Sequence, residues 1–259
     1  MVKRDANLAV LCVLTVVLLA LGGLVSDGAF LSLFNLQSMA TQVPEIGLLA
    51  IGVMLAMCAG NGGIDLSGIA NANMSGVAAG IFAIATVDAA TSPMLFTVVF
   101  AVGCMTVGLI AGILNGIIIS RFAITPILAT LGTQMLFTGV AVVLSDGRSL
   151  TIGSPDPLYE LGNGVLFGMP ISFLIFLAIG AVLAVVLRLT PYGMRLMLTG
   201  ANPKAAVYSG FRGVRIITTT YAIAGLLAGI AGIIIAARNV NVKWDYGTSY
   251  LLVAILIAV

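Results

Sequence analysis

The sequence contains no histidine and very few charged residues. Only 8% of its 259 residues are Asp, Glu, Lys or Arg, whereas a typical soluble domain carries about a quarter. A chain with so little charge has too few polar groups to cover a water-facing surface, so the composition excludes an ordinary soluble protein. The lack of histidine also removes the commonest general base and transition-metal ligand.

Cysteine and lysine are nearly as scarce. Cys12, Cys58 and Cys104 lie in apolar runs, where free thiols pack as small hydrophobic groups, so we predict neither a disulfide nor a metal site. None of the three lysines follows a phosphate-binding glycine-rich loop, so the chain has no Walker A motif. The net charge of +2 and the lack of aromatic residues among the basic ones argue against nucleic acid as a partner. We therefore predict no catalytic residue, no metal and no cofactor in this chain.

Hydrophobic residues, by contrast, make up 61% of the sequence. A bilayer core needs about 20 apolar residues per helix. We therefore predict an all-α integral membrane protein, a polytopic helix bundle that forms one transmembrane domain over residues 1–259. An eighth span opens near residue 249 and is incomplete at Val259, so we expect C-terminal spans to be missing from this chain. The seven complete spans are predicted near residues 8–26, 42–60, 66–86, 95–119, 126–144, 165–187 and 216–237.

Basic residues gather on one side of these predicted spans. Short loops rich in Lys and Arg remain cytoplasmic, so we predict a cytoplasmic N-terminus and a multi-pass protein of the bacterial inner membrane. Arg148, Arg238 and Lys243 then fall in outer loops, and Glu45 at the outer start of the second span. The basic residues predicted to be cytoplasmic are Lys3, Arg4, Arg121, Arg188, Arg195, Lys204, Arg212 and Arg215.

A glycine-rich stretch, Gly60-Asn61-Gly62-Gly63-Ile64-Asp65-Leu66-Ser67-Gly68, separates the second and third spans. Its glycines interrupt a helix, and non-helical backbone at membrane depth is tolerated only where protein buries it or water reaches it. Broken helices of this kind often line transport paths. Two roles are open for Asp65, a cap of the third helix and a lining of such a path, and the two roles are compatible. Asn61, Asp65 and Ser67 are therefore candidate pathway residues.

Amides and hydroxyls also occur inside apolar spans. Asn71 and Asn73 follow the glycine-rich stretch, and Thr130, Thr133 and Gln134 lie in the fifth span. Two interpretations stay open: hydrogen bonds between helices, or a polar lining for a hydroxylated solute. Glycines at four-residue spacing in the fourth span favour close helix packing; these are Gly108, Gly112 and Gly116.

Residues 188–215 form a long connection with five basic residues and no acidic one. The mixed polar and apolar pattern predicts an amphipathic cytoplasmic element. Asn202 followed by Pro203 favours the start of a short helix, since Asn caps helices and Pro suits their first turn. Gly210 is suited to end that helix.

The motifs resemble those of a known family. Gly62-Gly63-Ile64-Asp65-Leu66-Ser67 is similar to the signature of permease subunits in ribose-, xylose-, arabinose- and galactoside-type ABC importers, which share their architecture with branched-chain amino acid permeases. The likeness covers about residues 45–255. It continues in Gly112-Ile113-Leu114-Asn115-Gly116, in residues 124–133, in Thr190-Pro191-Tyr192-Gly193, in residues 200–206 and in Ser209-Gly210.

The resemblance implies a permease that translocates a monosaccharide or related polyol by alternating access. It implies a second permease copy or paralogue in the same bilayer and cytoplasmic ATPase subunits that hold ATP and Mg. A periplasmic solute-binding protein would deliver the solute. The family's coupling element corresponds to the cytoplasmic loop within residues 188–215. Its candidate residues here are Gly193, Arg195, Gly200, Asn202, Pro203, Lys204, Ala205, Ala206 and Gly210.

The chain also departs from the family. After the shared signature it continues Gly68-Ile69-Ala70-Asn71-Ala72-Asn73, with two amides where the family usually has Val-Gly-Ser and apolar residues. One alternative function is a branched-chain amino acid permease of the same architecture. Another is an ion-coupled secondary transporter, for which Asp65 and Glu45 are the candidate pair of buried carboxylates.

Overall fold

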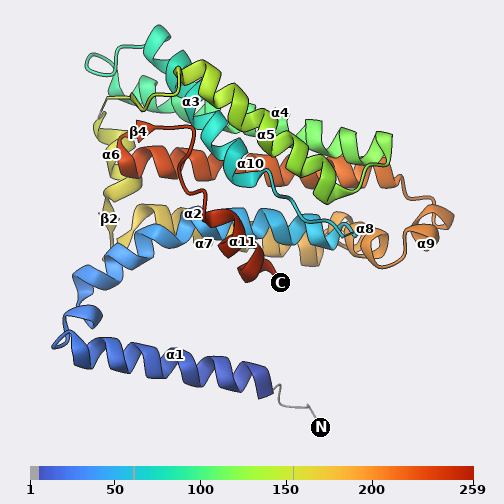
Figure 1. Cartoon of the computed structure of the whole chain (residues 1–259), viewed down its shortest axis with the longest axis horizontal. Helices are drawn as coiled ribbons and strands as arrows, with labels where there is room; N and C mark the ends of the chain where they lie inside the picture. The colour runs from blue at the N-terminus through green and yellow to red at the C-terminus, as the bar shows by residue number, and fades with distance from the viewer. Residues whose placement is uncertain (1–5, 61, 154) are drawn as a thin grey trace.

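The computed structural model describes residues 6–60, 62–153 and 155–259. It confirms an all-α polytopic architecture, in which long helices lie side by side in a bundle (Figure 1). Within these described ranges, six helices are long and apolar enough to cross a membrane, judged by length and composition. They are α2 (Leu33–Cys58), α3 (Gly68–Thr86), α4 (Pro93–Phe122), α5 (Pro126–Ser145), α7 (Ile171–Leu189) and α10 (Gly213–Asn239).

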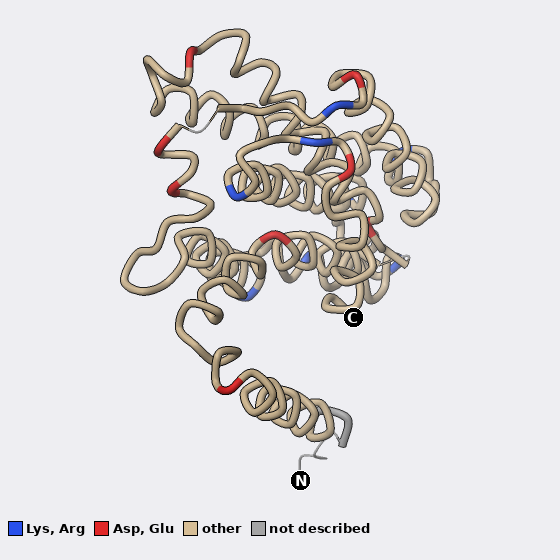
Figure 2. Tube along the Cα trace, turned by 60° about the vertical axis from the view of Figure 1, so that its left-hand side comes forward, with Lys and Arg blue, Asp and Glu red and all other residues tan. Residues whose placement is uncertain are grey.

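The first helix, α1 (Ala6–Val25), lies apart from this bundle in Figures 1 and 2. Its apolar side chains are exposed from Ala9 through Leu21. A helix that is apolar on every side requires an apolar environment, which agrees with the predicted first span. A short 3-10 turn, η1 (Ala29–Leu31), connects α1 to α2.

Two predicted boundaries were wrong. The second span was expected near residue 42, but α2 begins at Leu33, where the Ser32 hydroxyl accepts a hydrogen bond from the Asn35 amide at 3.3 Å. The sixth was expected from residue 165, but a hairpin of β2 (Val165–Leu166) and β3 (Met169–Pro170) precedes α7. Hydropathy alone missed the more polar first turns of α2, and it did not separate the apolar hairpin from α7.

Residues 145–164, which separate the predicted fifth and sixth spans, contain regular structure. It holds β1 (Leu150–Thr151) and a short helix, α6 (Asp156–Asn163). Strand β1 pairs antiparallel with β4 (Asn241–Val242), which follows α10. These short elements lie at one end of the bundle (Figure 1).

Helix α10 forms the centre of the bundle and packs most extensively against α4. Gly108, Gly112 and Gly116 of α4 face the backbone of α10, which confirms the predicted close packing. A Cβ added to Gly108 would lie 2.8 Å from the Gly229 Cα, and one added to Gly116 would lie 2.6 Å from the Thr218 Cα. The two backbones therefore touch, and no larger residue fits at these positions.

The opposite end of the bundle carries two short helices, α8 (Pro191–Ala201) and α9 (Pro203–Tyr208) (Figure 1). The last helix, α11 (Tyr250–Ala258), packs against α2. Figure 2 shows long helical stretches without a charged residue, as the low charge content predicted.

Candidate functional site

The glycine-rich stretch interrupts the helical path between α2 and α3. Gly60 and Gly62 adopt positive φ angles of 83° and 65°, which glycine adopts at no steric cost. A Cβ on Gly63 would collide with the Ala56 carbonyl oxygen. The predicted break is therefore present, and its backbone requires these glycines. Asn61, a predicted pathway residue, lies outside the described residues.

Thr130 of α5 fixes the non-helical backbone of this break. Its hydroxyl oxygen lies 3.1 Å from the Leu66 amide, which donates to it, and 3.1 Å from the Ile64 carbonyl oxygen. Thr130 is fully buried. A buried backbone group without a partner costs free energy comparable to a lost hydrogen bond, so Thr130 stabilises the break against α5.

Asp65 and Ser67 extend this polar cluster to α4. One Asp65 carboxylate oxygen accepts hydrogen bonds from the Ser67 amide at 2.9 Å and the Ser67 hydroxyl at 2.7 Å. Asn115 of α4 in turn donates to the Ser67 hydroxyl oxygen at 2.7 Å. Asn115 belongs to the Gly112–Gly116 motif, but the sequence did not predict it as a site residue. The break is thus held by side chains from two neighbouring helices.

Asp65 also borders a small cavity between α2, α3 and α11. Leu49, Gly52 and Ala254 contribute to its walls, and its volume of about 10 Å³ is enough for about one water molecule. Asp65 therefore binds Ser67, the residue that precedes α3, rather than an amide inside that helix. It thus orients the residue from which α3 starts, and its place on a transport path stays a prediction.

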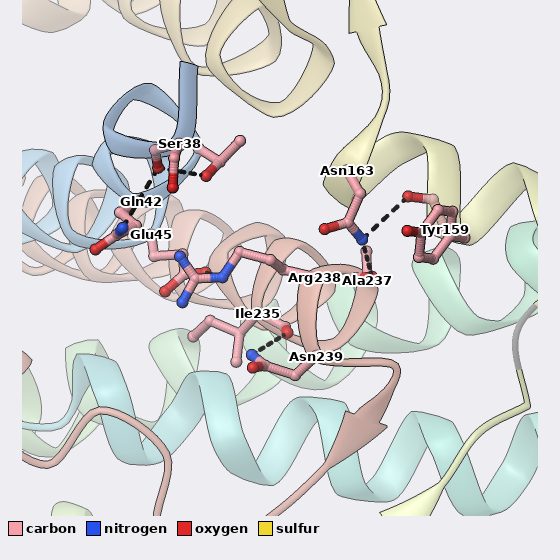
Figure 3. Close-up of polar contacts among 10 residues, drawn as sticks. Ser38, Gln42, Glu45, Tyr159, Asn163, Ile235, Ala237, Arg238 and Asn239 are labelled. Atoms are coloured by element: carbon pink, nitrogen blue, oxygen red, sulfur yellow. Dashed lines mark hydrogen bonds and ion pairs between the residues drawn. The ribbon is translucent and has the colours of Figure 1, made fainter. Parts of the chain in front are cut away.

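Glu45, which the sequence suggested as a possible partner of Asp65, forms an ion pair with Arg238 instead. Its carboxylate lies 3.0 Å from the Arg238 Nε atom, and Glu45 is only 1% exposed. Figure 3 shows Arg238 reaching from α10 towards Glu45 on α2. Relative to the helices, Glu45 lies inside α2, which begins at Leu33, and Arg238 lies in the last turn of α10 rather than in a loop.

The amides of α3 make hydrogen bonds to other parts of the chain. Asn71 donates to the Gly108 carbonyl of α4 at 3.2 Å and accepts from the Ser75 hydroxyl at 3.1 Å. The Asn73 amide donates to two backbone carbonyls of the connection between α10 and α11, those of Trp244 at 3.1 Å and Tyr246 at 2.9 Å. The additional amides of this sequence therefore link α3 to α4 and to residues 240–249.

Thr133 and Gln134 lie further along α5. Thr133 donates to the Thr130 carbonyl of its own helix at 3.2 Å. Gln134 is half-buried, and within the described part of the chain its buried carbonyl oxygen has no hydrogen-bond partner. Neither side chain is hydrogen-bonded to the described residues of the break.

Helix α8 contacts the break directly through glycine. A Cβ on Gly60 would lie 2.8 Å from the Gly200 Cα, and a Cβ on Gly200 would collide with the Cys58 carbonyl oxygen. Tyr192 connects α8 to α10, since its hydroxyl lies 2.8 Å from that of Thr220. Helix α8 is therefore packed against both the end of α2 and the central helix.

Helix α9 begins where the sequence predicted. The Asn202 side chain accepts a hydrogen bond from the Ala205 amide at 3.0 Å, and Pro203 occupies the first turn. Gly210, with a φ of 80°, follows the end of this helix. The helical structure of α8, which contains Gly193 and Arg195, was not predicted. Among the remaining candidates, Ala206 is buried and Lys204 is exposed.

Replacing Asn73 by alanine is expected to release residues 240–249. Two backbone carbonyls would lose their donor, and each unsatisfied buried group costs about 1–3 kcal/mol. We expect faster amide hydrogen exchange across residues 241–246. Asn239→Ala is the matched control, because the Asn239 amide donates to a carbonyl of its own helix, that of Ile235. Equal exchange in both variants would show that Asn73 does not hold this segment.

Comparison with known proteins gives a family match over most of the chain. Residues 35–259 match the family described as branched-chain amino acid transport system, permease component. No solved structure shows significant similarity.

The chain is also similar to sugar permeases. It is 32% identical to the ribose import permease protein RbsC of Bacillus subtilis over 229 residues, and these residues make up 88% of this chain and 68% of the relative. It is 34% identical over 192 residues to the galactofuranose transporter permease YtfT of Escherichia coli, covering 74% and 53%. The L-arabinose ABC transporter permease AraH of Azospirillum brasilense is 29% identical over 81% of this chain and 58% of its own length. The chain therefore belongs to this family of ABC importer permeases, as its motifs predicted.

Proposed function

We propose that this chain is the translocating subunit of an ATP-driven importer for a monosaccharide or related polyol. Transport would proceed by alternating access, with ATP and Mg bound on separate ATPase subunits. The sugar permeases among its relatives and the shared signature at Gly62–Ser67 support this class of solute. A second permease copy or paralogue and a periplasmic binding protein would complete the assembly.

The observation that carries this proposal is the contact between α8 and the break. Gly200 and Gly60 meet without side chains between them, so a displacement of α8 would act on the backbone of Gly60, where the break that contains Asp65 begins. An ATPase that moves α8 and α9 would thereby change the membrane-embedded segment. Gly193, Arg195 and residues 200–210 would form the coupling element.

The pathway, or the scaffold that shapes it, would include the break and the first turns of α3. Asn61, Asp65, Ser67, Asn71 and Asn73 belong to these segments, and Thr133 and Gln134 would contribute from α5. The buried Asp65 carboxylate supports this assignment. Ionisable groups inside membrane proteins usually serve a transport path or a structural pair, and the ion pairs of the described residues join Arg238 to Glu45 and Lys243 to Asp245.

The proposed orientation places α8 and α9 in the cytoplasm of a bacterial cell, with the protein in the inner membrane and the N-terminus inside. The positive-inside rule supports this orientation. The end of the bundle with α6 and β4 would then face the periplasmic binding protein.

A branched-chain amino acid is the second candidate solute, because the matching family carries that description. The ion-coupled secondary transporter is less well supported. Its candidate pair was Asp65 with Glu45, and Glu45 instead forms an ion pair with Arg238.

The test is a purification of the native complex in mild detergent, followed by counting of the co-purifying subunits. We expect one ATPase copy per permease copy, and loss of the ATPase when residues 195–210 are replaced by a Gly/Ser linker. Permease that purifies alone and transports solute in liposomes without ATP would overturn the importer and favour the secondary transporter.

A further inference from the structure

A cavity lined by arginine lies where α8, the turn after α9 and the start of α10 meet. Its volume is about 320 Å³, and Arg195, Arg212 and Arg215 all contribute to its walls. The Arg195 guanidinium lies 5.6 Å from the centre of the Phe211 ring, a distance typical of a cation–π contact. Phe211 also lines the cavity, so three cationic side chains surround one space.

Among the residues that the structure describes, no carboxylate pairs with these arginines. The sequence contains no Asp or Glu between Glu160 and Asp245. Across residues 6–60, 62–153 and 155–259, the ion pairs are those of Glu45 with Arg238 and of Asp245 with Lys243. The first turn of α10 has no acidic residue either, and the positive end of the helix dipole adds to the field. The cavity is therefore suited to an anion.

The position of the cavity indicates which anion. Arg212 immediately precedes α10 and Arg215 lies in its first turn, and α10 is a candidate membrane span. The arginines thus lie at the level where a span meets the headgroup layer. Large apolar side chains are exposed on the neighbouring segments of the chain, with Val214 at 45%, Val207 at 65% and Leu189 at 79%. A ligand with both a phosphate group and hydrocarbon chains would contact the two kinds of surface.

From these observations we infer that the Arg195–Arg212–Arg215 cavity binds the phosphate headgroup of an anionic phospholipid of the inner leaflet. The arginines would hold the phosphate through charge-assisted hydrogen bonds, which guanidinium groups form well with phosphate oxygens. The exposed apolar residues would face the acyl chains. The choice of leaflet rests on the proposed orientation, whereas binding itself does not depend on the transported solute or on ATPase activity.

The test is native mass spectrometry of the full chain in detergent, titrated with phosphatidylglycerol or with phosphatidylcholine. We expect one tightly held phosphatidylglycerol per chain and weaker binding of phosphatidylcholine. The double variant Arg212→Gln/Arg215→Gln should bind phosphatidylglycerol roughly 30-fold more weakly, from the typical attraction of an arginine for an anionic surface. Arg188→Gln is the matched control, because it removes one charge from the last turn of α7 and lies outside the cavity lining.

Other outcomes distinguish other ligands. Displacement of phosphatidylglycerol by millimolar inorganic phosphate would identify a free phosphate site and overturn the lipid assignment. Unchanged lipid binding in the double variant, with loss of the co-purifying ATPase, would show that the arginines contact protein instead. If the double variant does not purify, the gain in thermal stability on adding phosphatidylglycerol is compared between wild type and Arg215→Gln. An equal gain in both would also overturn the proposal.

Discussion

Replacing Gly200 by alanine is expected to slow solute uptake strongly while the ATPase subunits remain bound. The added Cβ would collide with the Cys58 carbonyl oxygen and crowd the backbone of Gly60. Both neighbours are backbone atoms that are unable to rotate away. Overpacking of this kind costs about 1–3 kcal/mol. If that cost falls on a state that transport must visit, uptake falls by roughly 10- to 100-fold.

A panel of monosaccharides is first tested with wild-type protein in proteoliposomes. ATP-driven uptake of the sugar that the wild type transports fastest is then measured for Gly200→Ala. ATPase co-purification is measured on the same preparation. Gly213→Ala is the matched control, because a Cβ there meets open space at the same end of the bundle. If Gly200→Ala takes up the sugar at the wild-type rate, the close contact of Gly200 with Gly60 is not needed for ATP-driven transport.

The second large effect is expected at the ion pair between α2 and α10. Arg238→Leu would leave the Glu45 carboxylate buried without its counter-charge, and breaking a buried pair costs about 3–5 kcal/mol. Replacing both partners, as in Glu45→Leu/Arg238→Leu, removes both charges at once. The double variant should therefore be more stable than the single Arg238→Leu variant, since apolar replacements of buried pairs are often neutral or stabilising.

Thermal unfolding in detergent compares these variants under identical conditions. The Lys243–Asp245 pair provides the matched control, because its side chains are 39% and 28% exposed. Exposed ion pairs contribute about 0–1 kcal/mol, so Lys243→Gln should change stability little. If the double variant is no more stable than Arg238→Leu, the unpaired Glu45 carboxylate does not lower the stability of the protein, and the prediction is wrong.

The spans could be predicted from the sequence because each is a long apolar run, and hydropathy is a local property. The break between α2 and α3 and the start of α9 at Asn202-Pro203 were also predicted from local rules, namely glycine content and helix capping. Helix α6 was missed because it has only eight residues and its neighbourhood resembles a loop in composition. Short helices depend on tertiary packing more than on their own sequence.

The polar residues of the candidate site could be selected by type, but not paired with their partners. Thr130 was recognised as a polar group inside a span, yet its position beside Leu66 depends on how α5 packs against α3. Glu45 and Arg238 are far apart in the sequence, so only the fold brings them together. The contact of Gly200 with Gly60 is likewise a tertiary contact between backbones, for which no local signal exists.

The glycine-lined contact of α4 with α10 has a mechanical consequence. Where two backbones touch at Gly108, Gly112 and Gly225, no side chain is available to change its rotamer and let one helix slide past the other. The two helices should therefore behave as one rigid rod during any rearrangement. Motion would then be confined to elements around this rod, such as α2, α11 and α8. A pair of distance probes would therefore miss this motion if both probes were attached to the rod, and one probe on α4 or α10 with the other on α2, α8 or α11 should detect it.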